Sequence, residues 1–200
     1  MSHDWRTPPL LQGRHVRLEP LQPAHADGIA AAAADGKLWE LWFTSVPRPE
    51  EVGTWLEGVL AKQAAGEQLA FVVRDADGRI VGSTRYYELL PETPRVCIGY
   101  TWYARSVQRT GLNTEAKLLL LGHAFGSMGC ASVGFHTSTF NTASRAAIAR
   151  LGAKEEGVLR QHMRHRDGSL RDTVCFSILD SEWPAVKAGL QQKLERHAHG

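Results

Sequence analysis

Apolar and polar residues follow two rhythms along this chain, and each rhythm predicts one type of element. Apolar positions that alternate with polar ones, or short runs rich in branched and aromatic residues, predict strands. These are expected at 13–19, 69–73, 79–86, 96–103, 131–137, 158–166 and 171–179. Apolar positions three and four residues apart predict helices. These are expected at 23–34, 50–63, within 107–125, and at 141–151 and 183–196.

The order of these elements predicts one mixed sheet. The segments Asp75–Gly78 and Asp167–Gly168 place an Asp-Gly pair between strand-like runs, which favours a tight hairpin. Helices connect most of the other strands, so the sheet should be neither purely parallel nor a sandwich. We therefore predict an α+β fold with an N-terminal arm at 1–12, a single domain at 13–196 and a flexible tail at 197–200.

Composition excludes some classes of function. The chain is 43% hydrophobic and 22% charged, with a net charge of +2, as expected of a soluble globular domain. It has no basic run interleaved with aromatic residues, which argues against nucleic-acid binding, and no apolar run long enough to cross a membrane. Three cysteines, Cys97, Cys130 and Cys175, lie in or beside apolar runs without a close pair. Reduced thiols in a cytoplasmic protein are the simplest interpretation.

The polar loop that opens the 107–125 segment is the first candidate site. Gly111 lets backbone approach a ligand closely, and a helix N-terminus offers unpaired N–H groups to an anion. Arg109 would add positive charge. The alternative is an ordinary helix start capped by Thr110 or Asn113. The two commonest phosphate-binding patterns, GxxxxGK[ST] and GxGxxG, are absent.

A wider pattern around this loop resembles a known family. Gln108-x-x-Gly111-x-Asn113 is similar to the acetyl-CoA signature of the GNAT N-acyltransferases. Gly-Leu-Asn-Thr-Glu-Ala at 111–116 resembles the version found in the RimJ/RimL-like branch. Further matches at that branch's spacing are Asn141–Ser144, Leu151–Ala153, Glu156–Gly157, Leu159–Arg160, Asp167–Gly168, Arg171–Asp172 and Glu182–Pro184. The similarity covers Arg14 to Leu194, although Asn113 stands where the family has Gly or Ala.

The resemblance implies a GNAT fold and a cofactor. The fold has a central mixed, mostly antiparallel sheet of about seven strands, flanked by helices, with a splayed parallel strand pair. The cofactor is acetyl-CoA, with its pyrophosphate at 108–114 and its thioester along Gly99–Ala104, where N–H groups near Trp102 would polarise the carbonyl. Without the family, that strand reads equally well as fully paired core sheet. The cofactor-binding residues implied are Tyr100, Trp102, Tyr103, Gln108, Arg109, Thr110, Gly111, Leu112, Asn113, Thr114, Asn141 and Ser144.

Two of these residues also carry implied catalytic roles. The resemblance places Asn141 on the pantetheine arm and Ser144 where it would protonate the leaving thiolate. A weak donor suffices, because a thiol such as that of Cys has a pKa near 8.5. The alternative is that Asn141 simply caps the helix, with Ser144 in the first turn, and capping and cofactor contact can coexist.

The general base is left open by the sequence. Met163 stands where some relatives carry Glu, and it cannot accept a proton. Glu40 is the leading substitute, because partial burial among Trp39, Trp42 and Phe43 would make it a better proton acceptor; the alternative is an exposed carboxylate. Further candidates are Glu88, His136, His162 and Glu115, and water could also relay the proton.

Aromatic residues mark a candidate acceptor site. Trp39, Trp42 and Phe43, together with Tyr86 and Tyr87, would line a site for an aromatic or cationic amine; the alternative is that such residues are core. A metal site is not expected. His162 and His165 form an HxxH pattern, but residues three apart in a strand point to opposite faces.

These features together predict an acetyl-CoA-dependent N-acyltransferase, in which an amine attacks the thioester directly. The acceptor would be a protein N-terminus or a small-molecule amine, and a symmetric homodimer is the default assembly. One alternative, favoured by Met163, is a non-catalytic acyl-CoA-binding or regulatory module of the same fold. Another is a mixed-sheet domain that binds a different ligand.

Overall fold

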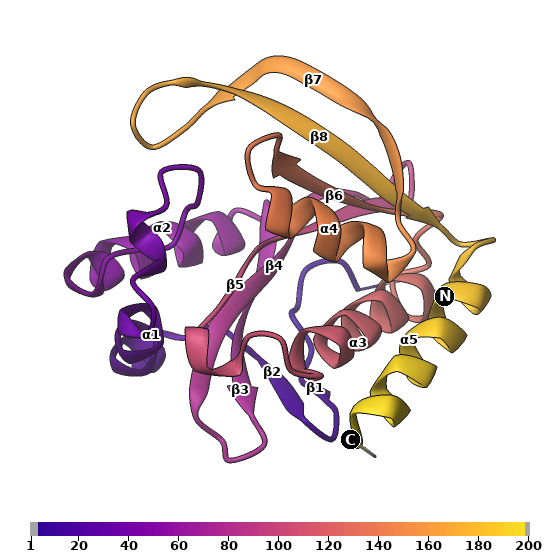
Figure 1. The fold of residues 1–200 in the computed structure, drawn as a ribbon, viewed down its shortest axis with the longest axis horizontal. Helices are drawn as coiled ribbons and strands as arrows, with labels where there is room; N and C mark the ends of the chain where they lie inside the picture. Colours follow the sequence, from indigo (N-terminus) through magenta and orange to yellow (C-terminus); the bar gives the residue numbers. More distant parts are fainter. Residues whose placement is uncertain (1–3, 199–200) are drawn as a thin grey trace.

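The structure is a computed structural model that describes residues 4–198 (Figure 1). Its strands are β1 (Leu11–Gln12), β2 (Val16–Pro20), β3 (Gln68–Asp75), β4 (Ile80–Leu90), β5 (Arg95–Tyr103), β6 (Ser132–Ser138), β7 (Lys154–Arg164) and β8 (Leu170–Leu179). Its helices are α1 (Ala26–Ala34), α2 (Val52–Ala64), α3 (Leu112–Gly126), α4 (Thr142–Leu151) and α5 (Trp183–Ala198). Short 3-10 turns lie at Pro23–His25, Leu38–Glu40, Pro49–Glu51 and Arg105–Val107. None of these helices combines the length and apolar character needed to span a bilayer.

One sheet holds all the described strands, in the order β1-β2-β3-β4-β5-β6-β8-β7. Every neighbouring pair is antiparallel except β5 and β6, which are parallel. That parallel pairing covers only Arg95–Cys97 on β5, after which the two strands diverge. The predicted α+β fold, with a mostly antiparallel sheet and a splayed parallel pair, is confirmed.

Helices cover the two faces of the sheet differently. The hydroxyl of Tyr86 donates to the carbonyl of Leu120 on α3, whereas the guanidinium of the preceding residue, Arg85, lies over the ring of Trp55 on α2. Successive side chains of a strand point to opposite faces, so α3 and α2 lie on opposite sides of β4. The α3 side is packed by apolar residues at helical spacing. They are Leu112, Ala116, Leu120, Leu121 and Ala124, all at most 5% exposed.

Two bulges interrupt the pairing of β4 with β5. Between the pairs Arg85↔Gly99 and Ser83↔Trp102, β5 carries an extra residue, and Tyr100 has a positive φ of 51°. Glu88 marks the second irregularity, with a φ of 50°. Left-handed conformations cost a non-glycine residue of the order of 1–3 kcal/mol and concentrate at functional sites. Both bulges lie beside the point where β5 and β6 separate.

The ends of the chain differ from the sequence prediction in detail. Leu11–Gln12, assigned to the arm, pairs with β2 as an additional short strand. Strand β7 begins at Lys154 rather than at 158, because it is an edge strand that is exposed along its whole length and shows no apolar alternation. Helix α5 continues to Ala198, so the predicted tail is helical over 197–198, and 199–200 lie outside the described residues.

Candidate functional site

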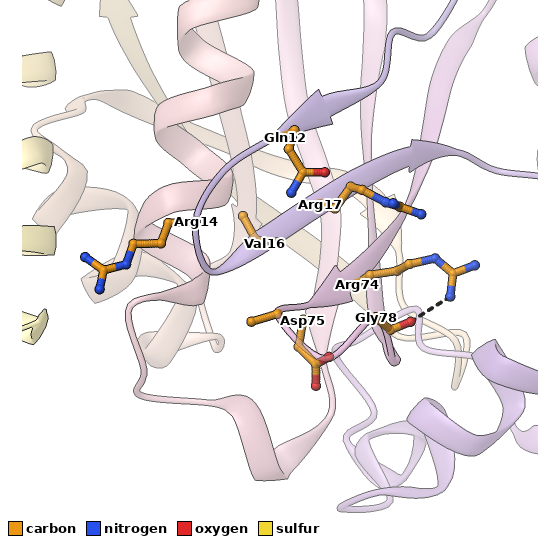
Figure 2. Close-up of a pocket in the computed structure, with 8 residues that line it drawn as sticks. Gln12, Arg14, Val16, Arg17, Arg74, Asp75 and Gly78 are labelled. Atoms are coloured by element: carbon orange, nitrogen blue, oxygen red, sulfur yellow. Dashed lines mark hydrogen bonds between the residues drawn. The ribbon is translucent and has the colours of Figure 1, made fainter.

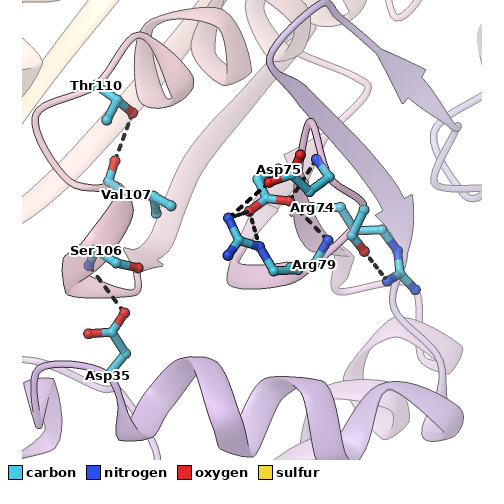
Figure 3. Close-up of polar contacts among 9 residues, drawn as sticks. Asp35, Arg74, Asp75, Arg79, Ser106, Val107 and Thr110 are labelled. Atoms are coloured by element: carbon cyan, nitrogen blue, oxygen red, sulfur yellow. Dashed lines mark hydrogen bonds and ion pairs between the residues drawn. The ribbon is translucent and has the colours of Figure 1, made fainter.

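The loop before α3 is tied down at both ends. The N–H groups of Arg105 and Ser106 donate to the carbonyl and the carboxylate of Asp35, at the end of α1, and Figure 3 shows the second contact. Thr110 Oγ1 donates to the carbonyl of Val107 at 2.8 Å, also drawn in Figure 3. Gln108 Nε2 donates to the carbonyl of Tyr103, which joins the loop to the end of β5. The loop is therefore fixed before any ligand arrives.

Backbone donors at the start of α3 are left without partners. Within the described residues, no acceptor meets the N–H groups of Arg109, Thr110, Gly111, Asn113 and Thr114. The N–H of Leu112 differs, because it donates to Thr110 Oγ1, and the Leu112 side chain is buried in the core. Thr110 thus satisfies one donor, as the capping alternative expected, and the others remain available to an anion. Arg109, with a φ of 62°, turns the chain here.

The strand leading into this loop presents unpaired backbone. Tyr100 and Thr101 have no register partner on β4, and β6 has already diverged. Trp102 and Tyr103 are largely buried, and the Trp102 Nε1 and Tyr103 hydroxyl have no hydrogen-bond partner. Burial raises the pKa of the Tyr103 hydroxyl, which keeps it a neutral donor. The backbone of Tyr100 and Thr101 is therefore the part of Gly99–Ala104 without a neighbouring strand to pair with.

Helix α4 starts on the far side of the splay. The side chain of Asn141 accepts a hydrogen bond from the Ser144 N–H at 3.0 Å, so Asn141 is the N-cap. The Ser144 hydroxyl is half-buried and has no partner within the described residues. Gly152, with a φ of 102°, ends the helix in the left-handed conformation that glycine favours. Asn141 therefore caps the helix, as the capping alternative expected, and does so through the Ser144 N–H and not its hydroxyl.

The face of the sheet opposite α3 holds a group of polar and aromatic side chains. Tyr87 lies at its centre, with its ring centroid 5.1 Å from that of Tyr100 and 6.1 Å from that of His136. The guanidinium of Arg85 lies 4.6 Å from the Tyr100 ring centroid and 5.2 Å from that of Trp55. Tyr100 is 40% exposed, so this face is open to solvent. We refer to it below as the acceptor face.

Tyr86 does not belong to the acceptor face, which corrects the sequence prediction. Its side chain has no exposed surface, and its hydroxyl is bonded within the core. Burial raises the pKa of that hydroxyl well above its ordinary value. Adjacent aromatic residues on a strand cannot both line one site, because the strand alternates between faces.

Glu88, Cys97 and His136 form a titratable cluster on the acceptor face. His136 Nδ1 lies 3.5 Å from Glu88 Oε1, and the Cys97 thiol donates to Glu88 Oε2 at 3.3 Å. Burial, the largest influence, lowers the pKa of His136, while Glu88 raises it. Burial raises the pKa of Cys97 to about 12, which keeps that thiol protonated at neutral pH. Their ligand atoms lie within 4.8 Å of one another, and they are the residues best placed to hold a metal ion in the described part of the chain.

Two carboxylates considered as bases occupy other environments. Glu40 is exposed in the turn at Leu38–Glu40 and lacks the burial on which its prediction rested. Glu115 is buried, but its carboxylate accepts hydrogen bonds from the N–H groups of Arg14 and His15. It therefore stabilises the turn between β1 and β2.

The aromatic residues after α1 form a rim and not a core. Trp42 is 39% exposed, and its ring centroid lies 5.6 Å from Phe43, 5.1 Å from Phe140 and 4.6 Å from His165. These contacts join the segment after α1 to the loop before α4 and to the β7–β8 turn. Arg166 of that turn pairs with Glu51 and donates to the Val46 carbonyl. Trp39 is half-buried, with no ring contact to Trp42 in the described structure.

Sequence reasoning missed Lys117. This residue of α3 is 6% exposed, and its Nζ donates to Thr101 Oγ1, which is 2.7 Å from Thr84 Oγ1. Burial lowers its pKa to about 7. A lysine amid an apolar helical stripe was the available signal, since lysines are rarely fully buried.

Two cavities lie away from these residues. One of about 180 Å³ sits at the β1–β2 turn, beside Arg14, Arg17, Arg74 and Asp75, and Figure 2 shows the Arg74 guanidinium directed to the Gly78 carbonyl. The other, of about 640 Å³, lies between the N-terminal segment and α2, beside Trp5, Leu60 and Leu89. Neither contains a residue predicted for the site.

Comparisons with known proteins bear on this geometry. Residues 15–154 match a family described as an acetyltransferase (GNAT) domain. A GCN5-related N-acetyltransferase from Brucella melitensis is 33% identical, with a TM-score of 0.84 over 93% of this chain and 85% of that one. Mycobacterium smegmatis RimJ, in complex with CoA-disulfide, is 25% identical, with a TM-score of 0.76 over 92% of this chain and 93% of that one. YdaF of Bacillus subtilis, provisionally described as a ribosomal N-acetyltransferase, is 25% identical over 177 residues, 86% of this chain and 96% of that protein.

Proposed function

Because this chain belongs to the GNAT acetyltransferase family, we propose that it moves an acetyl group from acetyl-CoA to an amine by direct attack. The observation that carries the proposal is the group of unpaired backbone N–H groups at 109–111 and 113–114, close in the chain to the bulge at Tyr100 where β5 loses its pairing with β4. Bound acetyl-CoA would supply an activated thioester, so no enzyme nucleophile is needed. The described cysteines suit this, since each thiol's pKa is raised by burial.

Two backbone segments would hold different parts of the cofactor. The free N–H groups of 109–111 and 113–114 would hold the pyrophosphate, aided by the positive end of the helix dipole and by Arg109. The backbone of Gly99–Ala104 would hold the pantetheine arm, with N–H groups near Trp102 aimed at the carbonyl oxygen. Asn141 and Ser144, across the splay, would contact that arm and supply a proton to the sulfur.

Glu88 and His136 would remove the proton from the amine. They lie beside the splay on the acceptor face, where an amine must approach the thioester. His136 is neutral near pH 7 because burial lowers its pKa, and it can accept a proton directly or through Glu88. Met163 is 45% exposed on β7. It stands where some relatives carry a Glu, so this chain lacks that base but retains the Glu88–His136 pair.

Replacing Glu88 tests the chemical step. We expect Glu88→Gln to lower kcat by about 10²- to 10⁴-fold, the usual contribution of a general base, with little change in KM for acetyl-CoA. Glu92→Gln is the matched control, because it makes the same change at an exposed residue in the turn between β4 and β5. This variant should keep its activity. A Glu88→Gln protein as active as that control would remove Glu88 from the mechanism.

The acceptor is proposed to be an amine on a peptide or a small molecule. The description of YdaF as a ribosomal N-acetyltransferase favours an amine of a ribosomal protein, and the acceptor face is open to solvent at Tyr100. Titration calorimetry with acetyl-CoA, followed by thiol release over a panel of peptide and small-molecule amines, tests this. Binding without release for every amine would favour the non-catalytic module instead.

A further inference from the structure

Three arginines of the acceptor face lack a carboxylate partner. Arg85 lies on β4, Arg95 at the start of β5 and Arg171 on β8. In each one the Nε is buried and has no hydrogen-bond partner. Arg85 is 6% exposed, and its only side-chain acceptor is Gln68 Oε1, at 3.2 Å. None of the three takes part in an ion pair within the described residues.

Six arginines elsewhere in the described structure do have carboxylate partners. Those paired with carboxylates are Arg17, Arg48, Arg74, Arg79, Arg145 and Arg166. These residues gain counter-charges although solvent already screens most of them. Burying a cation without a counter-charge is costly, because desolvation is not offset by attraction. The acceptor face therefore concentrates positive charge at the place where the fold can least easily stabilise it.

Two of the guanidinium groups, those of Arg85 and Arg171, lie by the same aromatic pair, and the charges of Arg95 and Arg171 both act on His136. Arg85 stacks on Tyr100, and the charge of Arg171 interacts with the hydroxyls of Tyr87 and Tyr100. Arg95 reaches Cys97 and His136 at the base of the splay. The carboxylate of Glu88 is nearby, but it is directed to His136 and Cys97 instead of to an arginine. The face thus has a proton acceptor and a separate set of unpaired cations.

We propose that the amine acceptor of this protein carries a carboxylate close to its amine, bound by Arg85, Arg95 and Arg171. The inference rests on the proposed acetyl transfer and names the class of its acceptor. Planar guanidinium groups match a carboxylate in paired hydrogen bonds, and a partly desolvated site strengthens them. The Tyr87–Tyr100 pair forms the floor between the cations and the Glu88–His136 pair, so the acceptor's two ends are recognised separately.

A metal ion is a poorer occupant of this face. Glu88, Cys97 and His136 would supply three ligand atoms, but the charge of Arg95 acts on both Cys97 and His136. A divalent cation would therefore meet positive charge, whereas an anion would be attracted by it.

Matched acceptors test the proposal. In the first pair, phenylalanine is compared with phenylalaninamide. In the second pair, a tetrapeptide amide that begins with Glu is compared with one that begins with Gln. For each, acetyl-CoA-dependent thiol release is measured, together with the dissociation constant for the protein saturated with coenzyme A. We expect at least one carboxylate acceptor to bind tenfold or more tightly than its carboxamide. A preference for the carboxylate in the first pair indicates that the acceptor is a free amino acid. A preference in the second pair indicates an acidic peptide N-terminus.

Arginine variants assign the preference to residues. The ratio to compare is the affinity for a carboxylate acceptor divided by the affinity for its carboxamide. Arg171→Gln should reduce this ratio at least tenfold and leave the KM for the carboxamide nearly unchanged. Arg85→Lys should reduce the ratio by less. Arg79→Gln, on the exposed β3–β4 turn, is the control. Equal binding of both members of every pair, or an unchanged ratio in Arg171→Gln, would overturn the inference even if acetyl transfer occurs. Tight carboxylate binding without any thiol release would keep the anion site and overturn the proposed function.

Discussion

Arg85 and Tyr86 are neighbours on β4, yet they belong to two differently built faces. Tyr86 is fully buried against α3, and its hydroxyl reaches the Leu120 carbonyl. Arg85 is almost as buried, but its Nε has no partner and its charge has no counter-ion. The Tyr86 hydroxyl is therefore satisfied within the chain, whereas the Arg85 Nε is not. A strand can serve packing and binding together because its two sets of side chains never share an environment.

The largest effect should follow from damaging the α3 face. Leu120→Ala leaves a cavity under a fully buried helix, and we expect a loss of about 2–5 kcal/mol in the free energy of unfolding. Urea denaturation measures this. Leu90→Ala removes an equal volume from a 45% exposed position and should change stability by no more than about 0.5 kcal/mol. A small loss in Leu120→Ala would mean that the α3 face is not the rigid one.

Lys117 is the exception on the α3 face, and it should make stability depend on pH. Its pKa is about 7 when folded and about 10.4 when unfolded, so between these values the unfolded chain binds more protons. Stability should therefore rise with pH from about 7 to 10, by up to about 1 kcal/mol per unit. Below pH 7 the cost of burial is at its maximum. Lys117→Met should remove this dependence and stabilise the protein at neutral pH, as denaturation at several pH values will reveal.

The smallest effect separates the two adjacent tyrosines. Tyr86→Phe deletes a buried hydrogen bond and leaves the Leu120 carbonyl unsatisfied, which should cost about 1–3 kcal/mol. Tyr87→Phe should cost about 0.5 kcal/mol or less, because no hydrogen bond of that hydroxyl exists within the described structure. The difference in their denaturation midpoints measures the contrast directly. Equal costs would show that the acceptor face is as tightly bonded as the core.

Local patterns carried most of the fold. The apolar spacing of 112–125 predicts α3, the Asp-Gly pairs predict both hairpins, and Asn141 has the side chain of an N-cap. These features depend on neighbours in sequence, so they can be read without tertiary structure. The edge strand β7 is the exception. It is exposed along its length, so its extent depends on its pairing with β8 and not on an apolar pattern.

The acceptor face is the part that the sequence conceals. Nothing local marks Glu88 or Tyr100 as left-handed, since neither is glycine, and tertiary pairing forces both bulges. Arg85 and Arg171 come from distant strands that the sheet order brings to one face. The prediction that Tyr86 and Tyr87 both line the acceptor site is wrong for Tyr86, because adjacent residues of a strand point to opposite faces. Side-chain direction decides the site, and composition does not.

The hydrogen bonds of Glu115 have a consequence for where the domain begins. The family match starts at residue 15, yet this carboxylate in α3 needs the N–H groups of Arg14 and His15, and Gly13 lies so close that a Cβ there would be 2.5 Å from the Glu115 carboxyl carbon. A protein shortened to the family boundary would keep every motif of the cofactor loop. It would lose the Arg14 N–H donor and the turn at Gly13 that packs against this buried carboxylate, in the first turn of α3. We therefore expect the minimal unit that folds to be longer than the unit that sequence similarity defines.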